Sequence, residues 1–286
     1  MNTVDLIRAP LPEFKNFEYR SWAEIFEYFR GDDSPHEVRR VADEIVRSGA
    51  RSIIDLQLGA GHRLSSVLAE LDRRDWKIAE VKGMDKDPQH VYATNAALKA
   101  GGHDAELKVM EWSEIPCSSW AQSADFGLLL GNCLTHRWHG SVSLTEATIR
   151  DDLRAIREVF GHNGRLFVDR RNFEFIGSIC AHTPQERMRR FSRMQSVCYH
   201  GLDDRRLAFP AYVSDELVVY HYYDLDQRVW SANDFFPVMH EAMLAAFQDL
   251  FTIDVVMSDY EARKAPVGQF IQYLVRKCDE SGKLCD

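Results

Sequence analysis

A glycine turn after an apolar run is the part of this sequence best suited to bind a ligand. The run 52–58 contains Asp55, and Gly59 and Gly61 follow it before a helical pattern begins. A buried parallel strand that ends in this way exposes backbone N–H groups and the positive end of a helix dipole. Because glycine has no side chain, a ligand can lie against the backbone of the turn.

A second acidic side chain lies at a spacing that suits ribose recognition. Asp85 ends another apolar segment, 24 residues after Gly61. A carboxylate at that place can accept hydrogen bonds from both hydroxyls of a ribose. Together, the glycine turn and Asp85 predict a cofactor that contains a nucleoside, and they leave open which one.

Strands and helices must alternate to position these residues at one edge of a sheet. Strands are expected at 52–58, 79–84, 105–110, 124–130, 164–169, 250–256 and 268–276. Helical patterns are expected at 62–73, 88–101 and 143–160, and over much of 20–48 with a break at 31–35. This alternation predicts an α/β fold, a Rossmann-like and mostly parallel sheet with helices on both faces. The short connection between the last two strands predicts an antiparallel C-terminal hairpin.

The segment 176–235 interrupts the alternation with strand-like runs. Tyr220 and Tyr222 lie in one of these runs and share a strand face because side chains alternate. We expect this segment to form an inserted antiparallel cap over the carboxyl edge of the sheet, where open α/β sheets bind ligands. The expected divisions are an N-terminal helical lid at 1–48, a cofactor-binding domain at 49–175 and 236–286, and a substrate cap at 176–235.

Composition limits the classes of function. The net charge of −9 over 286 residues argues against a nucleic-acid groove as the main surface. The sequence contains no run of about 18 apolar residues, so we expect no transmembrane helix. The first residues lack the apolar core of a signal peptide. The six cysteines form no CxxC pair, so we expect free thiols and no metal site. We therefore expect a cytoplasmic protein, and the sequence leaves homo-oligomerisation open.

Several segments occur in an order that is known from one enzyme family. They are the glycine loop 55–61, Met84-Asp85, Glu111-Trp112, Leu-Gly-Asn-Cys-Leu-Thr-His at 130–136, Asp-Arg-Arg-Asn-Phe-Glu-Phe-Ile at 169–176, Ser258-Asp259-Tyr260 and the strand ending at 273–277. Their order resembles class I S-adenosylmethionine-dependent methyltransferases, and more narrowly the glycine/sarcosine N-methyltransferase group. The resemblance covers most of 20–277. It implies S-adenosyl-L-methionine as the cofactor.

The resemblance also implies which residues hold the cofactor. They are Asp55, Gln57, Gly59, Gly61, Asp85, Glu111, Trp112 and Leu130. Trp112 is expected to stack on or beside the adenine, with Glu111 accepting from its amino group and Asp55 reaching the methionine amino group through water. Gln57 departs from the family, which usually has Gly or Ala there. Its side chain either crowds the loop or binds the methionine end of the cofactor.

A small molecule with a carboxylate is the acceptor that the resemblance implies. Arg171 matches the residue that holds this carboxylate, a task that suits the planar guanidinium. Asn132 would orient the amine near the methyl group. Tyr28 matches an aromatic residue near the active site, whose face could stabilise the sulfonium charge. Tyr220 and Tyr222 either line the substrate pocket or pack in the core.

Two neighbours of these residues receive weaker assignments. Arg170 alternates to the strand face opposite Arg171 and is expected to be solvated or ion-paired. Phe173 and Phe175 replace tyrosines of the family, so any contact through those hydroxyls is missing. Among the histidines, His200 and His221 of the cap are candidate bases.

The leading functional prediction is an S-adenosylmethionine-dependent N-methyltransferase for a small amino acid or another carboxylate-bearing amine. One alternative keeps the cofactor and cyclises its aminobutyrate arm into azetidine-2-carboxylate. Another alternative is a nicotinamide-dependent oxidoreductase, but Gly59 and Gly61 do not complete the Gly-x-Gly-x-x-Gly pattern of such enzymes. A binding module without catalysis is the remaining alternative.

Overall fold

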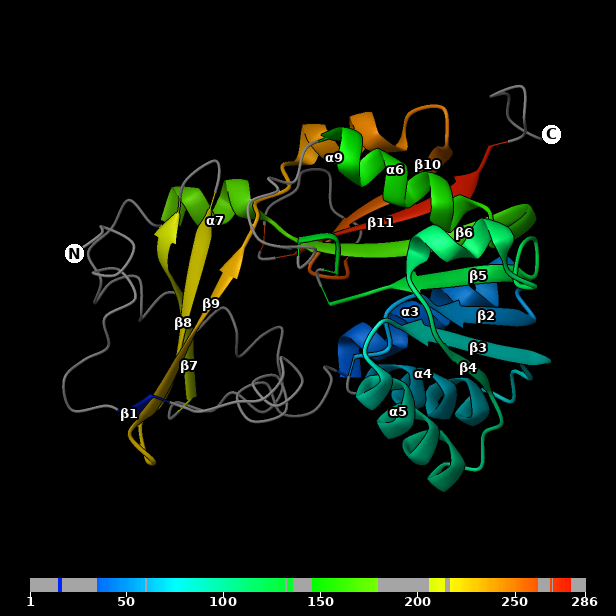
Figure 1. The fold of residues 1–286 in the computed structure, drawn as a ribbon, viewed down its shortest axis with the longest axis horizontal. Helices are drawn as coiled ribbons and strands as arrows, with labels where there is room; N and C mark the ends of the chain where they lie inside the picture. Colours follow the sequence, from blue (N-terminus) through cyan, green and yellow to red (C-terminus); the bar gives the residue numbers. More distant parts are fainter. Residues whose placement is uncertain are drawn as a thin grey trace.

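The strands of the protein form two separate sheets (Figure 1). A computed structural model of the chain describes residues 15–16, 35–59, 61–131, 133–135, 146–179, 206–213, 217–261, 268 and 270–278. None of the helices in these ranges is long and apolar enough to cross a membrane.

The larger sheet has seven described strands in the order β10-β11-β6-β5-β2-β3-β4. Their bounds are β2 (Ser52–Asp55), β3 (Glu80–Asp85), β4 (Glu106–Val109), β5 (Ala124–Leu129), β6 (Phe160–Arg171), β10 (Phe251–Ser258) and β11 (Phe270–Lys277). Strand β11 is antiparallel to both of its neighbours, and the other pairs are parallel. The predicted mostly parallel sheet with an antiparallel C-terminal hairpin is confirmed.

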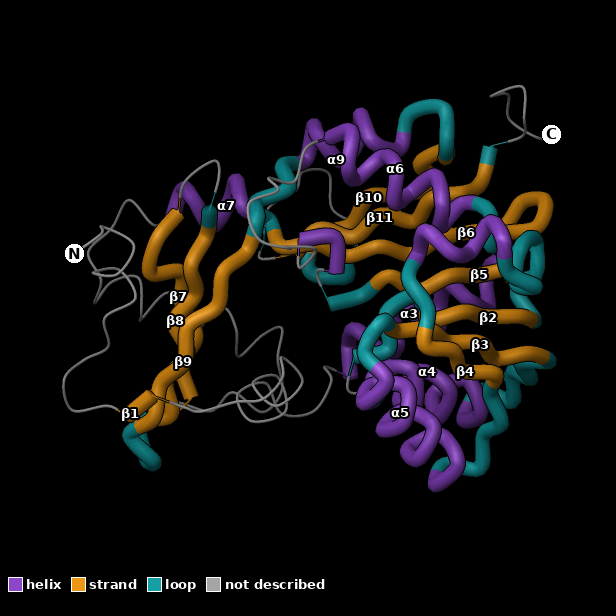
Figure 2. The backbone as a smooth tube through the Cα atoms, in the orientation of Figure 1, coloured by secondary structure: helices purple, strands orange, loops and turns teal. Residues whose placement is uncertain are grey.

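Helices cover both faces of this sheet, as Figure 2 shows. Helices α3 (Pro35–Ser48), α4 (His62–Arg73) and α5 (Pro88–Ala100) pack on one face, and α6 (Glu146–Arg157) and α9 (His240–Phe247) pack on the other. Ile53 and Ile54 are adjacent in β2, and both are fully buried. Because strand side chains alternate between faces, Ile53 packs with the first group of helices and Ile54 with the second.

Helix α3 packs on the larger sheet. Its buried residues Val38, Val41, Ala42 and Ile45 recur with helical spacing. They form one apolar cluster with α4 and with the strands. The helix begins at Pro35, a residue well suited to the first helical turn. This start lies at the end of the segment 31–35, where the sequence predicts a break in the helical pattern.

The boundary between α6 and β6 differs from the prediction. We expected the helix to continue to residue 160 and the strand to begin at 164, but α6 ends at Arg157 and β6 begins at Phe160. The pairing with β5 jumps from Phe160 to Arg165, so the glycine cluster between them is an irregularity inside the strand. Phe160 is fully buried, with its ring 6.3 Å from that of Phe251. This tertiary packing keeps Phe160 in the strand.

The smaller sheet has antiparallel strands that lie within the segment 176–235, where the cap is predicted. Its antiparallel strands β7 (Arg206–Val213), β8 (Val218–Asp224) and β9 (Val229–Phe235) lie between α7 (Phe173–Ile179) and α9 in the chain. Helix α7 follows the carboxyl end of β6 and packs against β7, and Figure 1 shows it beside the smaller sheet. A short strand β1 (Lys15–Asn16) pairs parallel to β9, which the sequence did not predict.

The division of the chain into lid, cofactor-binding domain and cap stays a prediction. Most of the expected lid, residues 1–14 and 17–34, lies outside the described residues. The described parts of 1–48 go to different places, because α3 packs on the larger sheet and β1 joins the smaller one.

Candidate functional site

The two glycines of the turn differ in what surrounds them. Gly59 has φ +52° and Gly61 has φ +77°, a region that side chains rarely adopt. A Cβ atom on Gly61 would lie 2.4 Å from Thr94 Oγ1, whereas nothing lies within 4 Å of the corresponding position on Gly59. Gly61 therefore allows α4 to begin against α5, and Gly59 leaves open space in front of the turn.

The two acidic residues at the strand ends hold this turn. Asp55 Oδ1 accepts a hydrogen bond from Gln57 N at 3.1 Å. Asp85 Oδ2 accepts one from Gly59 N at 3.0 Å, and Asp85 Oδ1 accepts one from Asp87 N at 2.9 Å. Both carboxylates are buried. The Asp85 carboxylate thus joins the glycine turn to the loop after β3.

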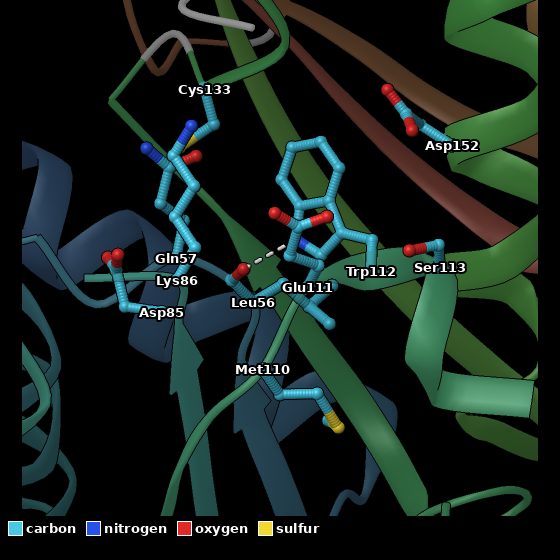
Figure 3. Close-up of a pocket in the computed structure, with 10 residues that line it drawn as sticks. All are labelled: Leu56, Gln57, Asp85, Lys86, Met110, Glu111, Trp112, Ser113, Cys133 and Asp152. Carbon is cyan, nitrogen blue, oxygen red and sulfur yellow. Dashed lines mark hydrogen bonds between the residues drawn. The ribbon is translucent and has the colours of Figure 1, made fainter. Parts of the chain in front are cut away.

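A cavity of about 200 Å³ opens at the carboxyl ends of β2, β3 and β4 (Figure 3). The described residues that line it are Leu56, Gln57, Asp85, Lys86, Met110, Glu111, Trp112, Ser113, Cys133 and Asp152. Four of the residues assigned to the cofactor from the sequence, Gln57, Asp85, Glu111 and Trp112, are therefore in one cavity.

Trp112 presents its ring, not its N–H group, to the cavity. It begins the short helix η1 (Trp112–Cys117), and its Nε1 donates to the Leu56 carbonyl at 2.7 Å. Figure 3 shows this bond, and the indole is half-buried. The backbone N–H of Glu111 donates to Glu114 Oε2 at 2.7 Å. Adenine stacking by Trp112 stays a prediction, and it is consistent with this orientation.

The environment of Cys133, a residue of the cavity wall, disfavours ionisation of its thiol. Its Sγ donates to the Leu130 carbonyl at 2.6 Å. Burial raises the pKa of the thiol well above its ordinary value, and the charges of Asp169 and Asp55 raise it further. Since only the thiolate is a good nucleophile, the residue forms a neutral part of the cavity wall.

Arg171 is held against the smaller sheet. It ends β6 and is only 4% exposed. Its guanidinium carbon lies 4.4 Å from the centre of the Tyr220 ring, 5.3 Å from that of Phe235 and 5.2 Å from that of Phe270. The Tyr222 ring centre lies 6.3 Å from that of Tyr220. The structure brings Arg171 and Tyr220 together, and neither is among the described residues that line the cavity.

Arg170 was expected to be either solvated or ion-paired. The structure shows the ion-paired arrangement, and the expectation of a solvated side chain is wrong. It is fully buried and contacts Glu174 Oε2 at 3.1 Å, the Val238 carbonyl at 2.7 Å and Tyr273 Oη at 3.0 Å. Burial acts to raise the pKa of Glu174, but Arg170 and the His240 N–H outweigh it and lower that pKa. Arg170 thus joins α7 and the segment before α9 to β11.

Some predicted residues are not at this site or cannot be compared with it. Asn132, Tyr28 and His200 lie outside the described residues. His221 is buried on the β8 face opposite Tyr220, and its ring packs against Trp230 with centres 5.4 Å apart. This placement gives no support to a role as base beside Arg171.

Six cavity residues were not assigned to the site from the sequence, and one of them, Leu56, belongs to the predicted glycine loop 55–61. Four others are next to predicted strand ends or lie beside or within predicted motifs: Lys86, Met110, Ser113 and Cys133. Their positions in the sequence could therefore have predicted that they lie at the site. Asp152 comes from the middle of α6 and had no such signal. Among the described residues, no group of three or more His, Cys, Asp and Glu side chains could hold a metal ion.

Comparisons with known proteins show which solved structures share this fold. No family model and no curated protein matches this chain. A solved S-adenosylmethionine-dependent methyltransferase from Clostridium acetobutylicum ATCC 824 aligns with TM-score 0.60 and 13% identity, over 90% of this chain and 97% of its own. Protein PH0226 from Pyrococcus horikoshii OT3 aligns with TM-score 0.58 and 12% identity, over 91% and 100%. The CcbJ methyltransferase from Streptomyces caelestis aligns with TM-score 0.55 and 14% identity, over 86% and 97%.

The fold is that of the S-adenosylmethionine-dependent methyltransferases. In this methyltransferase fold the antiparallel strand β11 lies between β6 and β10. Dinucleotide-binding Rossmann folds have the order 3-2-1-4-5-6, without an inserted antiparallel strand. The topology therefore does not favour the nicotinamide-dependent alternative.

Proposed function

We propose that the protein is an S-adenosylmethionine-dependent N-methyltransferase for a small amino acid or another carboxylate-bearing amine. The observation that carries the proposal is the single cavity that Gln57, Asp85, Glu111 and Trp112 line. It lies at the carboxyl edge of a sheet with methyltransferase topology, where open α/β sheets bind ligands.

The cavity residues fit the cofactor group by group. Each Asp85 oxygen accepts one backbone N–H and keeps a lone pair for a ribose hydroxyl. The open space at Gly59 admits a ligand close to the backbone. The Trp112 ring offers a face to adenine, and the exposed Glu111 carboxylate offers an acceptor to its amino group. When bound, S-adenosylmethionine would supply an electrophilic methyl group on a sulfonium.

Arg171 supports a carboxylate-bearing acceptor. Its guanidinium lies among aromatic rings of both sheets, where low polarity strengthens a bidentate pair with a carboxylate. Such a pair would orient the amine for in-line attack and exclude water from it, without a metal or a covalent intermediate. We further propose, on the sequence resemblance, that Asn132 orients the amine and that Tyr28 lies near the sulfonium.

Product analysis tests the proposal. The protein is incubated with S-adenosylmethionine and pooled amino acids, and the products are identified by mass spectrometry. We expect S-adenosylhomocysteine and a methylated amine. Methylthioadenosine would instead indicate cyclisation of the aminobutyrate arm, and the absence of both products would contradict the proposal. Asp85→Asn should abolish turnover. Asp125→Asn is the matched control, because its carboxylate accepts from Arg51 N and Ser52 N at the opposite edge of the sheet.

A further inference from the structure

The imidazole of His90 lies against the carboxylate that we assign to the ribose. Its Nδ1 atom is 3.1 Å from Asp85 Oδ2, and its Nε2 atom is 3.9 Å from Asp87 Oδ2. His90 lies in the first turn of α5, and its side chain is only 15% exposed. Water therefore screens these contacts less than it screens surface contacts.

The acceptor sites of Asp85 are already half occupied. Gly59 N donates to Oδ2 and Asp87 N donates to Oδ1. A carboxylate has about four lone-pair sites, so roughly one remains on each oxygen. Two ribose hydroxyls would use both of these sites. A positive charge on the His90 ring, with Nδ1 3.1 Å from Oδ2, is placed to attract the Asp85 carboxylate and so to oppose its hydrogen bond with a ribose hydroxyl.

Two carboxylates lie within 4.0 Å of the His90 ring. Both stabilise an imidazolium. Lys86 lies between them in the chain and lines the cavity. Helix α4, which packs against α5, begins with His62 and Arg63. Arg63 is held by Glu37 of α3 at 2.7 Å, so its charge is balanced.

We propose that His90 is a proton-dependent competitor for Asp85, so that a ribose-bearing ligand binds with release of a proton. This inference rests on the assignment of Asp85 to the ribose in the proposed function. At low pH the imidazolium pairs with Asp85 and opposes the hydroxyl. At high pH the neutral ring no longer attracts the carboxylate, so Asp85 Oδ2 can accept the ribose hydroxyl. Because the free protein holds more protons than the complex, affinity falls as the pH falls.

Calorimetric titration with S-adenosylhomocysteine tests this inference. From about pH 7.5 to about pH 5.5, across the ordinary imidazole pKa of about 6.5, the affinity of the unchanged protein should fall roughly tenfold. Titrations in buffers of different ionisation enthalpy should show proton release. His90→Leu should bind with an affinity that changes less than about twofold over this range, without proton release.

A matched histidine provides the control. His103 Nε2 lies 3.6 Å from Asp72 Oδ2, and its side chain is also 15% exposed, but it follows the other end of α5. His103→Leu should keep the full pH dependence. If His90→Leu does not fold, His90→Gln replaces the ring by a group that does not titrate and should give the same flat profile.

The outcomes separate this inference from the proposed function. Unchanged pH dependence and proton release in His90→Leu and His90→Gln would overturn the role of His90. Asp85→Asn that binds S-adenosylhomocysteine as tightly as the unchanged protein would instead overturn the ribose assignment. Loss of binding in Asp85→Asn, together with a flat profile in the His90 variants, is the result that we expect.

Discussion

The guanidinium of Arg171 lies 4.4 Å from the centre of the Tyr220 ring. Arg171 ends β6 of the larger sheet, and Tyr220 lies in β8 of the smaller one. The two residues are therefore a point of direct contact between the cap and the carboxyl edge of the sheet. A cation above an aromatic face is stabilised by the ring quadrupole, so the cap sets the position of the arginine.

Arg171→Ala should raise the KM for the acceptor much more than it changes cofactor affinity. We expect an increase of roughly tenfold to a hundredfold, because hydrogen bonds to charged groups contribute about 1.5–3 kcal/mol. Steady-state kinetics and titration with S-adenosylhomocysteine measure the two effects separately. Equal losses in both would mean that Arg171 supports the structure and does not bind the acceptor.

Tyr220→Phe and Tyr220→Leu should differ in their effect on the acceptor KM. Phenylalanine keeps the aromatic face under the guanidinium, so its KM should stay near that of the unchanged protein. Leucine removes a contact of roughly 0.5–2 kcal/mol and should raise the KM several-fold. If both variants raise the acceptor KM equally, the contribution of Tyr220 comes from its hydroxyl and not from its ring face.

Alanine at the two glycines of the turn should have different main effects, one on stability and the other on cofactor binding. Gly61→Ala should lower the free energy of unfolding by at least about 1 kcal/mol, because the new Cβ would meet Thr94. Gly59→Ala has no such clash, so it should lose less stability but weaken S-adenosylhomocysteine binding. Chemical denaturation and calorimetry distinguish these effects. A Gly59→Ala variant with unchanged affinity would show that the cofactor does not approach this backbone.

Glu174 should contribute stability that depends on pH. Its pKa is lowered in the folded protein although burial opposes this, because Arg170 is its partner. The contribution is therefore present above the ordinary glutamate pKa of about 4.3 and is lost as the pH falls through the lower folded value. Glu174→Gln should be less stable than the unchanged protein at neutral pH, and the difference should shrink below about pH 4. Denaturation at a series of pH values measures it, with Glu158→Gln as a matched change on another segment. A difference that does not vary with pH would contradict this assignment.

Local patterns were sufficient for most of the larger sheet. The glycine turn, Asp85 and Glu111-Trp112 each follow a strand, and parallel strands place their carboxyl ends at one edge. Their meeting in one cavity could therefore be anticipated without coordinates. The β6 boundary could not, because Phe160 is kept in the strand by its contact with Phe251, far along the chain.

The sequence by itself determined the fold class and the residues at the carboxyl edge, because strand ends and glycine conformations obey local rules. Only the tertiary structure decided that Asp152 reaches the cavity, that His90 touches Asp85 and that Arg171 lies against Tyr220. The physical reason is that side-chain contacts between separate elements depend on how helices and sheets pack. That packing is set by the whole buried core and not by the spacing of residues along the chain.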